Sequence, residues 1–163
     1  MANVFEPEYD RVEDRVGFSY RGAQVGRQAG GERLGVSLYE LEPGNATFPY
    51  HYHYANEELL IVLAGRPHLR GPDGWRQLEP GDVVAFVVGE RGAHQIANRS
   101  EEPVRFLVVS QMKAPDVTVY PDSGKVGVRE EAPGSGRGGR RENFYSSDSV
   151  DYWESERPPE VPS

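Results

Sequence analysis

The sequence has no cysteine among its 163 residues, which excludes disulfide bonds, thiolate metal ligands and cysteine nucleophiles together. Lysine is almost absent as well, so Schiff-base chemistry has only two candidates, Lys113 and Lys125. Hydrophobic residues make up 37% of the chain, which is low for a globular protein. We therefore expect part of the chain to lie outside the core of what its length predicts to be one domain.

Basic residues are also in the minority, with 18 Lys and Arg against 26 Asp and Glu and a net charge of -8. This balance disfavours binding to nucleic acid backbones or anionic membranes, and we expect neither as a partner. The N-terminus lacks the basic start and apolar stretch of a secretory signal. The apolar run Leu59–Ala64 is far shorter than the about 20 residues of a membrane helix. We therefore expect a cytoplasmic protein.

Turn-forming residues are abundant, with 19 Gly and 13 Pro, and they divide residues 33–113 into short apolar segments. This spacing favours an all-β sandwich or barrel. The continuous apolar run Val83–Val88 predicts a strand that is buried on both faces. The predicted strands are Leu34–Leu41, Leu59–Ala64, Pro67–Arg70, Trp75–Leu78, Val83–Val88, Ala93–Ala97 and Val104–Ser110.

The flanking regions predict irregular N- and C-terminal arms. Residues 1–32 form an N-terminal arm with enough Val, Phe and Tyr to add strands across a partner. Residues 114–131 predict flanking strands and turns, with strands over Val117–Tyr120 and Lys125–Val128. Because the edges of an open sheet must be covered and two-fold pairing is the commonest assembly, we expect a homodimer.

Residues 132–163 predict a flexible linker followed by a C-terminal arm. The linker, 132–141, is rich in Gly, Ser and Arg. Residues 143–153 then carry four aromatic side chains, more than a solvated tail needs. The arm is either disordered or docked on the barrel or on a second subunit, and our prediction is an ordered arm.

Three of the four histidines have a spacing typical of metal ligands. His51 and His53 lie two apart on an extended segment, so both rings point the same way from Cα atoms about 7 Å apart. A carboxylate follows at Glu57 or Glu58, and His94 comes after a Gly-bounded turn. Three imidazoles and a carboxylate suit Fe, Mn, Co, Ni, Cu or Zn rather than Ca or Mg. The sequence thus predicts one divalent transition metal.

Two motifs around these histidines resemble those of the cupin superfamily. The first cupin motif reads Gly, five residues, His-x-His, three or four residues, Glu, six residues, Gly, and it resembles Gly44–Gly65 with one extra residue before His51. Its spacing favours Glu58 over Glu57. The second motif resembles Gly81–Asn98, where Val87 replaces a Pro and two extra residues precede His94.

The resemblance implies a single cupin-type, jelly-roll-like double-stranded β-barrel over residues 33–113. It also implies that one divalent metal is held inside the barrel; the implied ligands are His51, His53, Glu58 and His94. Ligand imidazoles usually donate their free N–H to a neighbouring acceptor. The candidate positioning groups near them are Tyr50, Tyr52, Tyr54, Asn56 and Gln95.

Four protein ligands leave positions open on the metal, so a small molecule could bind there directly. The leading interpretation is a metal-dependent enzyme, of the dioxygenase or isomerase/epimerase type, that acts on a small oxygen-bearing molecule. The alternative is a non-catalytic module that binds a sugar or another small molecule. A storage cupin ranks last, because such proteins usually have two barrels or a secretory signal.

Overall fold

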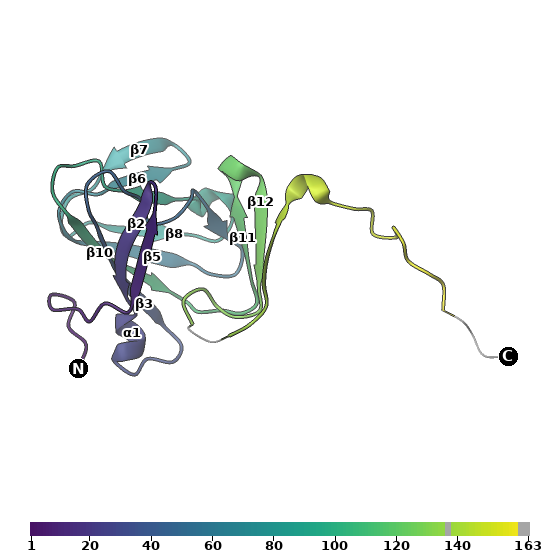
Figure 1. Cartoon of the computed structure of the whole chain (residues 1–163), viewed down its shortest axis with the longest axis horizontal. Coiled ribbons are helices and arrows are strands. Elements are labelled where there is room, and N and C mark those ends of the chain that lie inside the picture. The colour runs from purple at the N-terminus through teal and green to yellow at the C-terminus, as the bar shows by residue number, and fades with distance from the viewer. Residues whose placement is uncertain (136–137, 160–163) are drawn as a thin grey trace.

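The computed structural model describes residues 1–135 and 138–159, which form thirteen strands, one short α-helix and three 3₁₀ turns (Figure 1). The strands are β1 Arg11–Arg15, β2 Phe18–Ala23, β3 Gly35–Leu41, β4 Tyr52–His53, β5 Glu58–Ala64, β6 His68–Gly71, β7 Gly74–Gln77, β8 Val83–Phe86, β9 Gln95–Ala97, β10 Val104–Ser110, β11 Asp116–Tyr120, β12 Lys125–Arg129 and β13 Arg141–Tyr145. The helix is α1 Val25–Gln28, and the turns are η1 Glu90–Gly92, η2 Pro121–Ser123 and η3 Ser146–Asp148. None of the helices in these two ranges has the length and hydrophobicity needed to span a bilayer.

The strands form three antiparallel sheets, which confirms the all-β prediction. The largest sheet has the order β1-β2-β3-β10-β5-β8, and the smaller sheets have the orders β13-β12-β11-β4 and β7-β6-β9. Neighbours such as β3 and β10 are distant in the chain, so the hydrophobic pattern predicts the strands but not their order. Figure 1 shows β11 and β12 of the second sheet at the side of the body, next to strands β2 and β5 of the large sheet.

The core follows from the alternation of side chains along the strands. In β3, Tyr39 and Leu41 face the interior, whereas Leu38 and Glu40 face the opposite side of the sheet. The outer side packs with the N-terminal segment and α1 around Ala23, Val25 and Leu38. The main core consists of Tyr39, Leu41, Leu60, Val62, Leu69, Leu78, Phe86, Ile96, Val104 and Phe106.

The prediction that Val83–Val88 is buried on both faces is wrong. The strand β8 ends at Phe86 and lies at the edge of its sheet, paired only with β5. Val83 is 57% exposed and Val88 is 46% exposed, while Phe86 is buried in the core. An apolar run reports hydrophobicity but not position within a sheet, so it cannot distinguish a central strand from an edge strand.

The N-terminal arm extends the chain's own sheet, and pairing of its strands across a partner stays a prediction. β1 pairs with β2 along its whole length, and β2 pairs with β3 over the last three residues of β2, Arg21–Ala23. A buried carboxylate fastens this arm, since Glu40 accepts hydrogen bonds from Tyr9, Arg21 and Arg105. The arm therefore belongs to the folded body.

The C-terminal region is only partly an arm. Gln24 Nε2 donates to the carbonyl of Gly134 at 2.5 Å, so the start of the predicted linker packs on the body, and residues 136–137 of that linker lie outside the described residues. β13 then pairs with β12.

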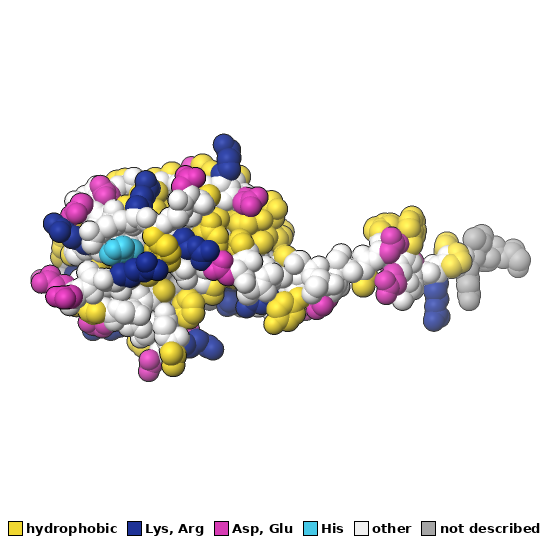
Figure 2. Space-filling view, turned by 90° about the horizontal axis from the view of Figure 1, so that it is seen from above, with side chains coloured by type: hydrophobic (Ala, Val, Ile, Leu, Met, Phe, Trp, Pro, Cys, Tyr) yellow, Lys and Arg dark blue, Asp and Glu magenta, His cyan; other side chains and the backbone are white. Residues whose placement is uncertain are grey.

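Beyond β13 the tail leaves the body, as the yellow segment of Figure 1 shows, and it stands clear in the space-filling view (Figure 2). Tyr152 and Trp153 are 80% and 73% exposed. The predicted ordered segment, 143–153, is therefore divided: residues 143–145 pair with β12, whereas docking of Tyr152 and Trp153 on their own barrel is wrong. Docking on a second subunit stays a prediction. Residues 160–163 of the arm lie outside the described residues.

Candidate metal centre

Backbone pairing brings the separated histidines together. His51 and His94 form an isolated antiparallel bridge in which each backbone N–H donates to the other's carbonyl, at 3.1 and 2.9 Å. His53 lies on β4, opposite Thr118 of β11. The ring centre of His51 is 4.6 Å from that of His94 and 5.0 Å from that of His53. Residues 43 apart in sequence therefore share one site.

The two extra residues before His94 fit into the turn η1, where a glycine is required. A Cβ atom on Gly92 would lie 1.8 Å from the carbonyl oxygen of Val87, so no other residue fits without moving the backbone. At the start of the turn, Gly89 N–H donates to the carbonyl of His53 at 2.8 Å. The turn therefore holds His94 against the strand that carries the other two rings.

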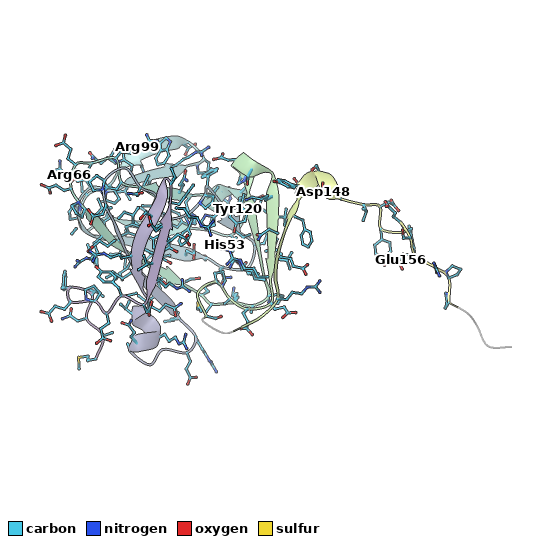
Figure 3. All side chains as sticks on the ribbon, viewed as in Figure 1. His53, Arg66, Arg99, Tyr120, Asp148 and Glu156 are labelled. Atoms are coloured by element: carbon cyan, nitrogen blue, oxygen red, sulfur yellow. The ribbon has the colours of Figure 1, made fainter. Side chains whose placement is uncertain are left out.

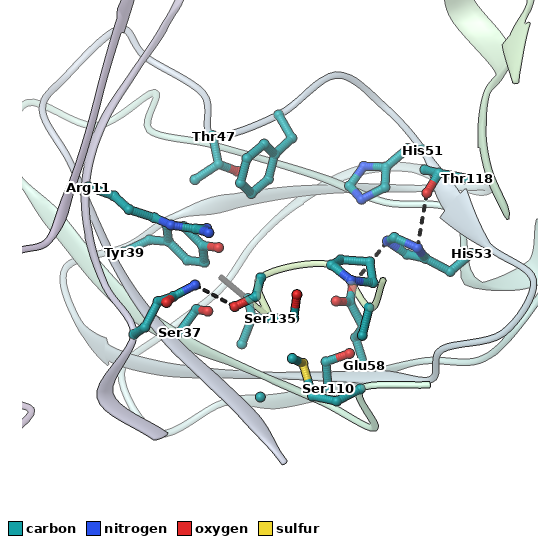
Figure 4. A pocket seen from close by; sticks show the side chains of 18 of the residues that line it. Arg11, Ser37, Tyr39, Thr47, His51, His53, Glu58, Ser110, Thr118 and Ser135 are labelled. Carbon is teal, nitrogen blue, oxygen red and sulfur yellow. Dashed lines mark hydrogen bonds and ion pairs between the residues drawn. The ribbon is translucent and has the colours of Figure 1, made fainter. Parts of the chain in front are cut away.

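The carboxylate that joins the histidines is Glu58, at the start of β5. Its Oε2 lies 3.4 Å from Nε2 of His94 and 3.7 Å from Nε2 of His53. The ligand atoms of His51, His53 and Glu58 all lie within 4.8 Å of one another. Glu57, the alternative ligand, is exposed. Figure 4 shows the Glu58 carboxylate beneath the rings of His51 and His53.

The hydrogen bonds of the three rings determine which nitrogen faces the interior. Nδ1 of His51 donates to the carbonyl of Pro49 at 2.8 Å, and Nδ1 of His94 donates to that of Gly92 at 2.9 Å. Nδ1 of His53 donates to the buried carboxylate of Asp116 at 2.6 Å. Carbonyl and carboxylate oxygens only accept, so each Nδ1 carries a proton, and Nε2 is the nitrogen of each ring that is left to bind a metal. Three Nε2 atoms are thus available as ligands beside one carboxylate.

The five side chains suggested from the sequence as positioning groups make other contacts. Among the described residues, the hydrogen bonds of the three rings go instead to Pro49, Gly92, Asp116 and Thr118. Asn56 bonds the backbone of Lys113 and also donates a side-chain hydrogen bond to Asp116, the carboxylate that holds His53. Gln95 bonds the carbonyl of Phe48. The tyrosines contact Arg70 (Tyr50) and each other (Tyr52 and Tyr54).

Asp116 is the residue that the sequence reasoning missed. It is fully buried at the start of β11, and its Oδ1 also accepts from the backbone N–H of Ala55 at 3.1 Å. An acidic residue directly before the apolar alternation of Val117–Tyr120 is the only sequence signal it gives. The contact to His53 depends on β4 pairing with β11, which no local pattern reveals.

The electrostatics of the cluster match a metal site. Burial, helped by the charges of His94 and His53, lowers the pKa of His51 to about 3. Burial opposes ionisation of Glu58, but its hydrogen bond with His94 and the charge of His53 outweigh this, so the pKa of Glu58 is lowered. A neutral His51 and an ionised Glu58 at neutral pH are the forms in which these side chains bind metals. The residues therefore fit a divalent transition metal.

A cavity of about 1280 Å³ extends from this cluster between β1–β3 and β11–β13. Figure 3 shows His53 and Tyr120 at the junction between the body and the β11–β12 hairpin. Ser110 lies opposite Glu58 in the sheet, and its buried hydroxyl lines the cavity without a hydrogen-bond partner among the residues that the structure describes. An unpartnered buried hydroxyl is costly, which is typical of a ligand-binding position.

The comparisons with known proteins agree with the fold and the cluster. The cupin domain model matches residues 37–110, which include all four predicted ligands. A proposed sugar phosphate isomerase from Acidithiobacillus ferrooxidans is 28% identical, with a TM-score of 0.72 over 83% of this chain and 81% of that chain. A cupin superfamily sugar phosphate isomerase from Silicibacter pomeroyi is also 28% identical, with a TM-score of 0.71 over 80% and 78%.

The fold is shared by a polyketide cyclase from Streptomyces resistomycificus, which is 23% identical. Its TM-score is 0.56, over 68% of this chain and 77% of that chain. A search of curated proteins finds no match to this chain. The all-β barrel with its internal His-His-Glu cluster has the architecture of a cupin. The match to the cupin model over residues 37–110, together with the two isomerase structures, supports a small cupin-type protein, as the motifs predict.

Proposed function

We propose that this cupin is a metal-dependent isomerase that acts on a small phosphorylated sugar. The observation that carries the proposal is the cluster of His51, His53, His94 and Glu58 at one end of a cavity large enough for such a substrate. The two sugar phosphate isomerase structures, which align with about four fifths of the chain, support the choice of substrate class.

The four clustered side chains would hold the metal, which when bound polarises a carbonyl or hydroxyl oxygen. Around it, Ser110 offers a free hydroxyl beside Glu58 and can orient a substrate oxygen. Burial raises the pKa of Tyr39 to about 12, so its phenol stays protonated and can donate a hydrogen bond into the cavity. Phe86 stacks on His94 with ring centres 3.8 Å apart and excludes water from that side.

The test is isomerisation of a panel of aldose and ketose phosphates by protein loaded with Mn, Fe, Co, Ni or Zn. Proton transfer between adjacent carbons incorporates solvent deuterium, which NMR detects. We expect metal-dependent turnover that the His53→Ala variant loses. The His68→Ala variant, which changes the histidine outside the cluster, is the matched control and should keep its activity.

Two results would contradict the proposal. Tight binding of a sugar phosphate without turnover would favour the non-catalytic binding module. Consumption of O2 with a sugar or another oxygen-bearing substrate would favour a dioxygenase. Elemental analysis of protein purified without added metal identifies the native metal.

We also propose a homodimer, supported by two exposed apolar side chains at the β8 edge of the large sheet, Val83 at the start of β8 and Val88 just beyond its end. Light scattering at micromolar concentration should give twice the 18.2 kDa chain mass. A monomer mass would contradict this prediction. A cytoplasmic location is likewise a proposal, which cell fractionation tests.

A further inference from the structure

Two arginines stand directly opposite each other on the hairpin that borders the cavity. Arg129 of β12 pairs in register with Arg141 of β13, and both line the cavity. Like charges directly opposite on neighbouring strands destabilise a sheet. An anion bound between them would remove this cost.

In the part of the chain that the structure describes, neither guanidinium has an acidic partner. Among residues 1–135 and 138–159, no carboxylate forms an ion pair with Arg129 or Arg141. Nε of Arg129 is buried without a hydrogen-bond partner among the same residues, and its NH2 group makes one long contact, 3.5 Å, to the hydroxyl of Tyr120. By contrast, the adjacent Arg140 pairs with Glu142 at 2.5 Å.

A third guanidinium faces this pair from the opposite wall. Arg11 of β1 lines the same cavity, and Figure 4 shows it beside Tyr39. Acidic residues, including Glu13 and Glu131, also line the cavity. In the described chain, however, none of them forms an ion pair with the three arginines, and Glu13 pairs with Arg15 at 2.7 Å instead.

We propose that Arg11, Arg129 and Arg141 form an anion subsite that binds the phosphate group of the substrate. Planar guanidinium groups bind phosphate oxygens through paired N–H bonds. A phosphate in this cavity could therefore accept hydrogen bonds from Arg11 on one wall and from Arg129 and Arg141 on the other. The inference rests on the proposed function, because it places the sugar end of the substrate toward Glu58 and Ser110. Free inorganic phosphate has the same chemistry, so the experiment separates the two sources.

The test compares Arg129→Gln/Arg141→Gln with the control Arg76→Gln/Arg140→Gln, which removes the same charge from exposed positions outside the cavity. Calorimetry measures binding of inorganic phosphate and of a sugar phosphate to each metal-loaded protein. We expect about a tenfold or greater loss of affinity for both anions in the cavity variant, from the loss of charged hydrogen bonds. The control should bind both as the unaltered protein does.

Thermal unfolding shows whether the cavity variant folds. It also tests the charge repulsion between Arg129 and Arg141 independently of the binding measurement. Without phosphate, the cavity variant should unfold at a higher temperature than the unaltered protein, because the repulsion between two opposed charges is gone. With phosphate present, the unaltered protein should gain thermal stability and the variant should gain much less. A lower unfolding temperature without phosphate would count against the repulsion argument and so against the subsite.

The outcomes separate this inference from the proposed function. Unchanged phosphate affinity in the cavity variant, or an equal loss in the control, overturns the subsite even where isomerisation is observed. Phosphate binding that depends on Arg129 and Arg141 and persists in His53→Ala supports the subsite even where no isomerisation is found. If only inorganic phosphate binds through the arginines and sugar phosphates do not, the assignment to a substrate phosphate is overturned.

Discussion

Two glutamates, Glu40 on β3 and Glu58 on β5, are buried to almost the same degree, with 8% and 9% of their surface exposed. Their strands flank β10 in one sheet. Glu40 accepts from Tyr9 at 2.8 Å, from Nε and NH2 of Arg105 at 3.0 and 2.5 Å, and from Arg21. Glu58 has no basic side chain paired with it in the described chain, and its nearest nitrogens belong to His94 and His53.

The difference shows that partners, rather than burial, distinguish a structural carboxylate from a ligand. Glu40 has cations and a phenol as donors, so its charge is compensated and it holds the N-terminal arm to the sheet. The close partners of Glu58 are two imidazole nitrogens at 3.4 and 3.7 Å, whereas Glu40 accepts from a phenol at 2.8 Å and from a guanidinium at 3.0 Å. Imidazoles bind a metal as neutral rings, so a bound cation would compensate the charge of Glu58. We therefore expect substitutions of the two glutamates to have opposite effects.

The largest expected effect is the loss of metal from Glu58→Gln. Replacing the anionic donor by a neutral amide should lower metal content at least about tenfold, since one charged ligand interaction exceeds 1.4 kcal/mol. Elemental analysis after dialysis measures this. Glu57→Gln makes the same change at the adjacent exposed residue and should retain its metal. Equal metal content in the two variants would contradict the assignment of Glu58.

Glu40→Gln should have the complementary effect, with metal retained and stability lost. The change weakens the hydrogen bonds from Arg105 and Tyr9, and we expect a loss of about 2–4 kcal/mol in the free energy of unfolding. The Arg21 side chain is about half exposed, so its share is small. Urea unfolding measures the change, with the exposed Glu42→Gln as control. Loss of metal without loss of stability would invalidate the contrast between the two glutamates.

Asp116→Asn should weaken metal binding without abolishing it. The amide is a poorer acceptor for Nδ1–H of His53, so the ring loses orientation and basicity, and affinity should fall about 10–100-fold. Competition with a chelator measures the affinity. Asp148→Asn, on the exposed turn η3, is the control. Unchanged affinity would mean that His53 is held by packing alone.

Acidification should destabilise the metal-free protein. His51 has a pKa of about 3 in the folded state, against about 6.5 when unfolded, so the unfolded chain binds the proton first. This contribution to stability is complete above about pH 6.5 and decreases by about 1.4 kcal/mol per unit as the pH falls toward 3. The lowered pKa values of Glu58 and Asp116 add losses below about pH 4.

Urea unfolding between pH 7 and 4.5 measures how the free energy of unfolding changes with pH. The His51→Ala variant should lose the part of this slope that one bound proton contributes, about 1.4 kcal/mol per pH unit. A flat profile for the unaltered metal-free protein would refute the depressed pKa of His51. With metal bound, loss of metal should steepen the decline, because protons compete for the same imidazoles.

Most of the barrel and the ligand set could be predicted because the signals for them are local. Alternating apolar residues place Val104–Ser110 as a strand with the observed bounds, and the His-x-His spacing puts His51 and His53 on one face. The spacing to Gly65 favours Glu58 over Glu57, and the structure buries Glu58. These features depend on residues within one or two strands of each other.

The rest depends on which strands become neighbours. The sequence by itself determined the all-β class, the turns and the candidate histidine and glutamate ligands, because side-chain period and turn chemistry act over a few residues. Only the tertiary structure decided that β8 is an edge, that Asp116 supports His53, and that Arg11, Arg129 and Arg141 line one cavity. The last two arrangements join segments more than 60 residues apart. Strand order, which sets them, is fixed by burial of the whole core rather than by any local pattern.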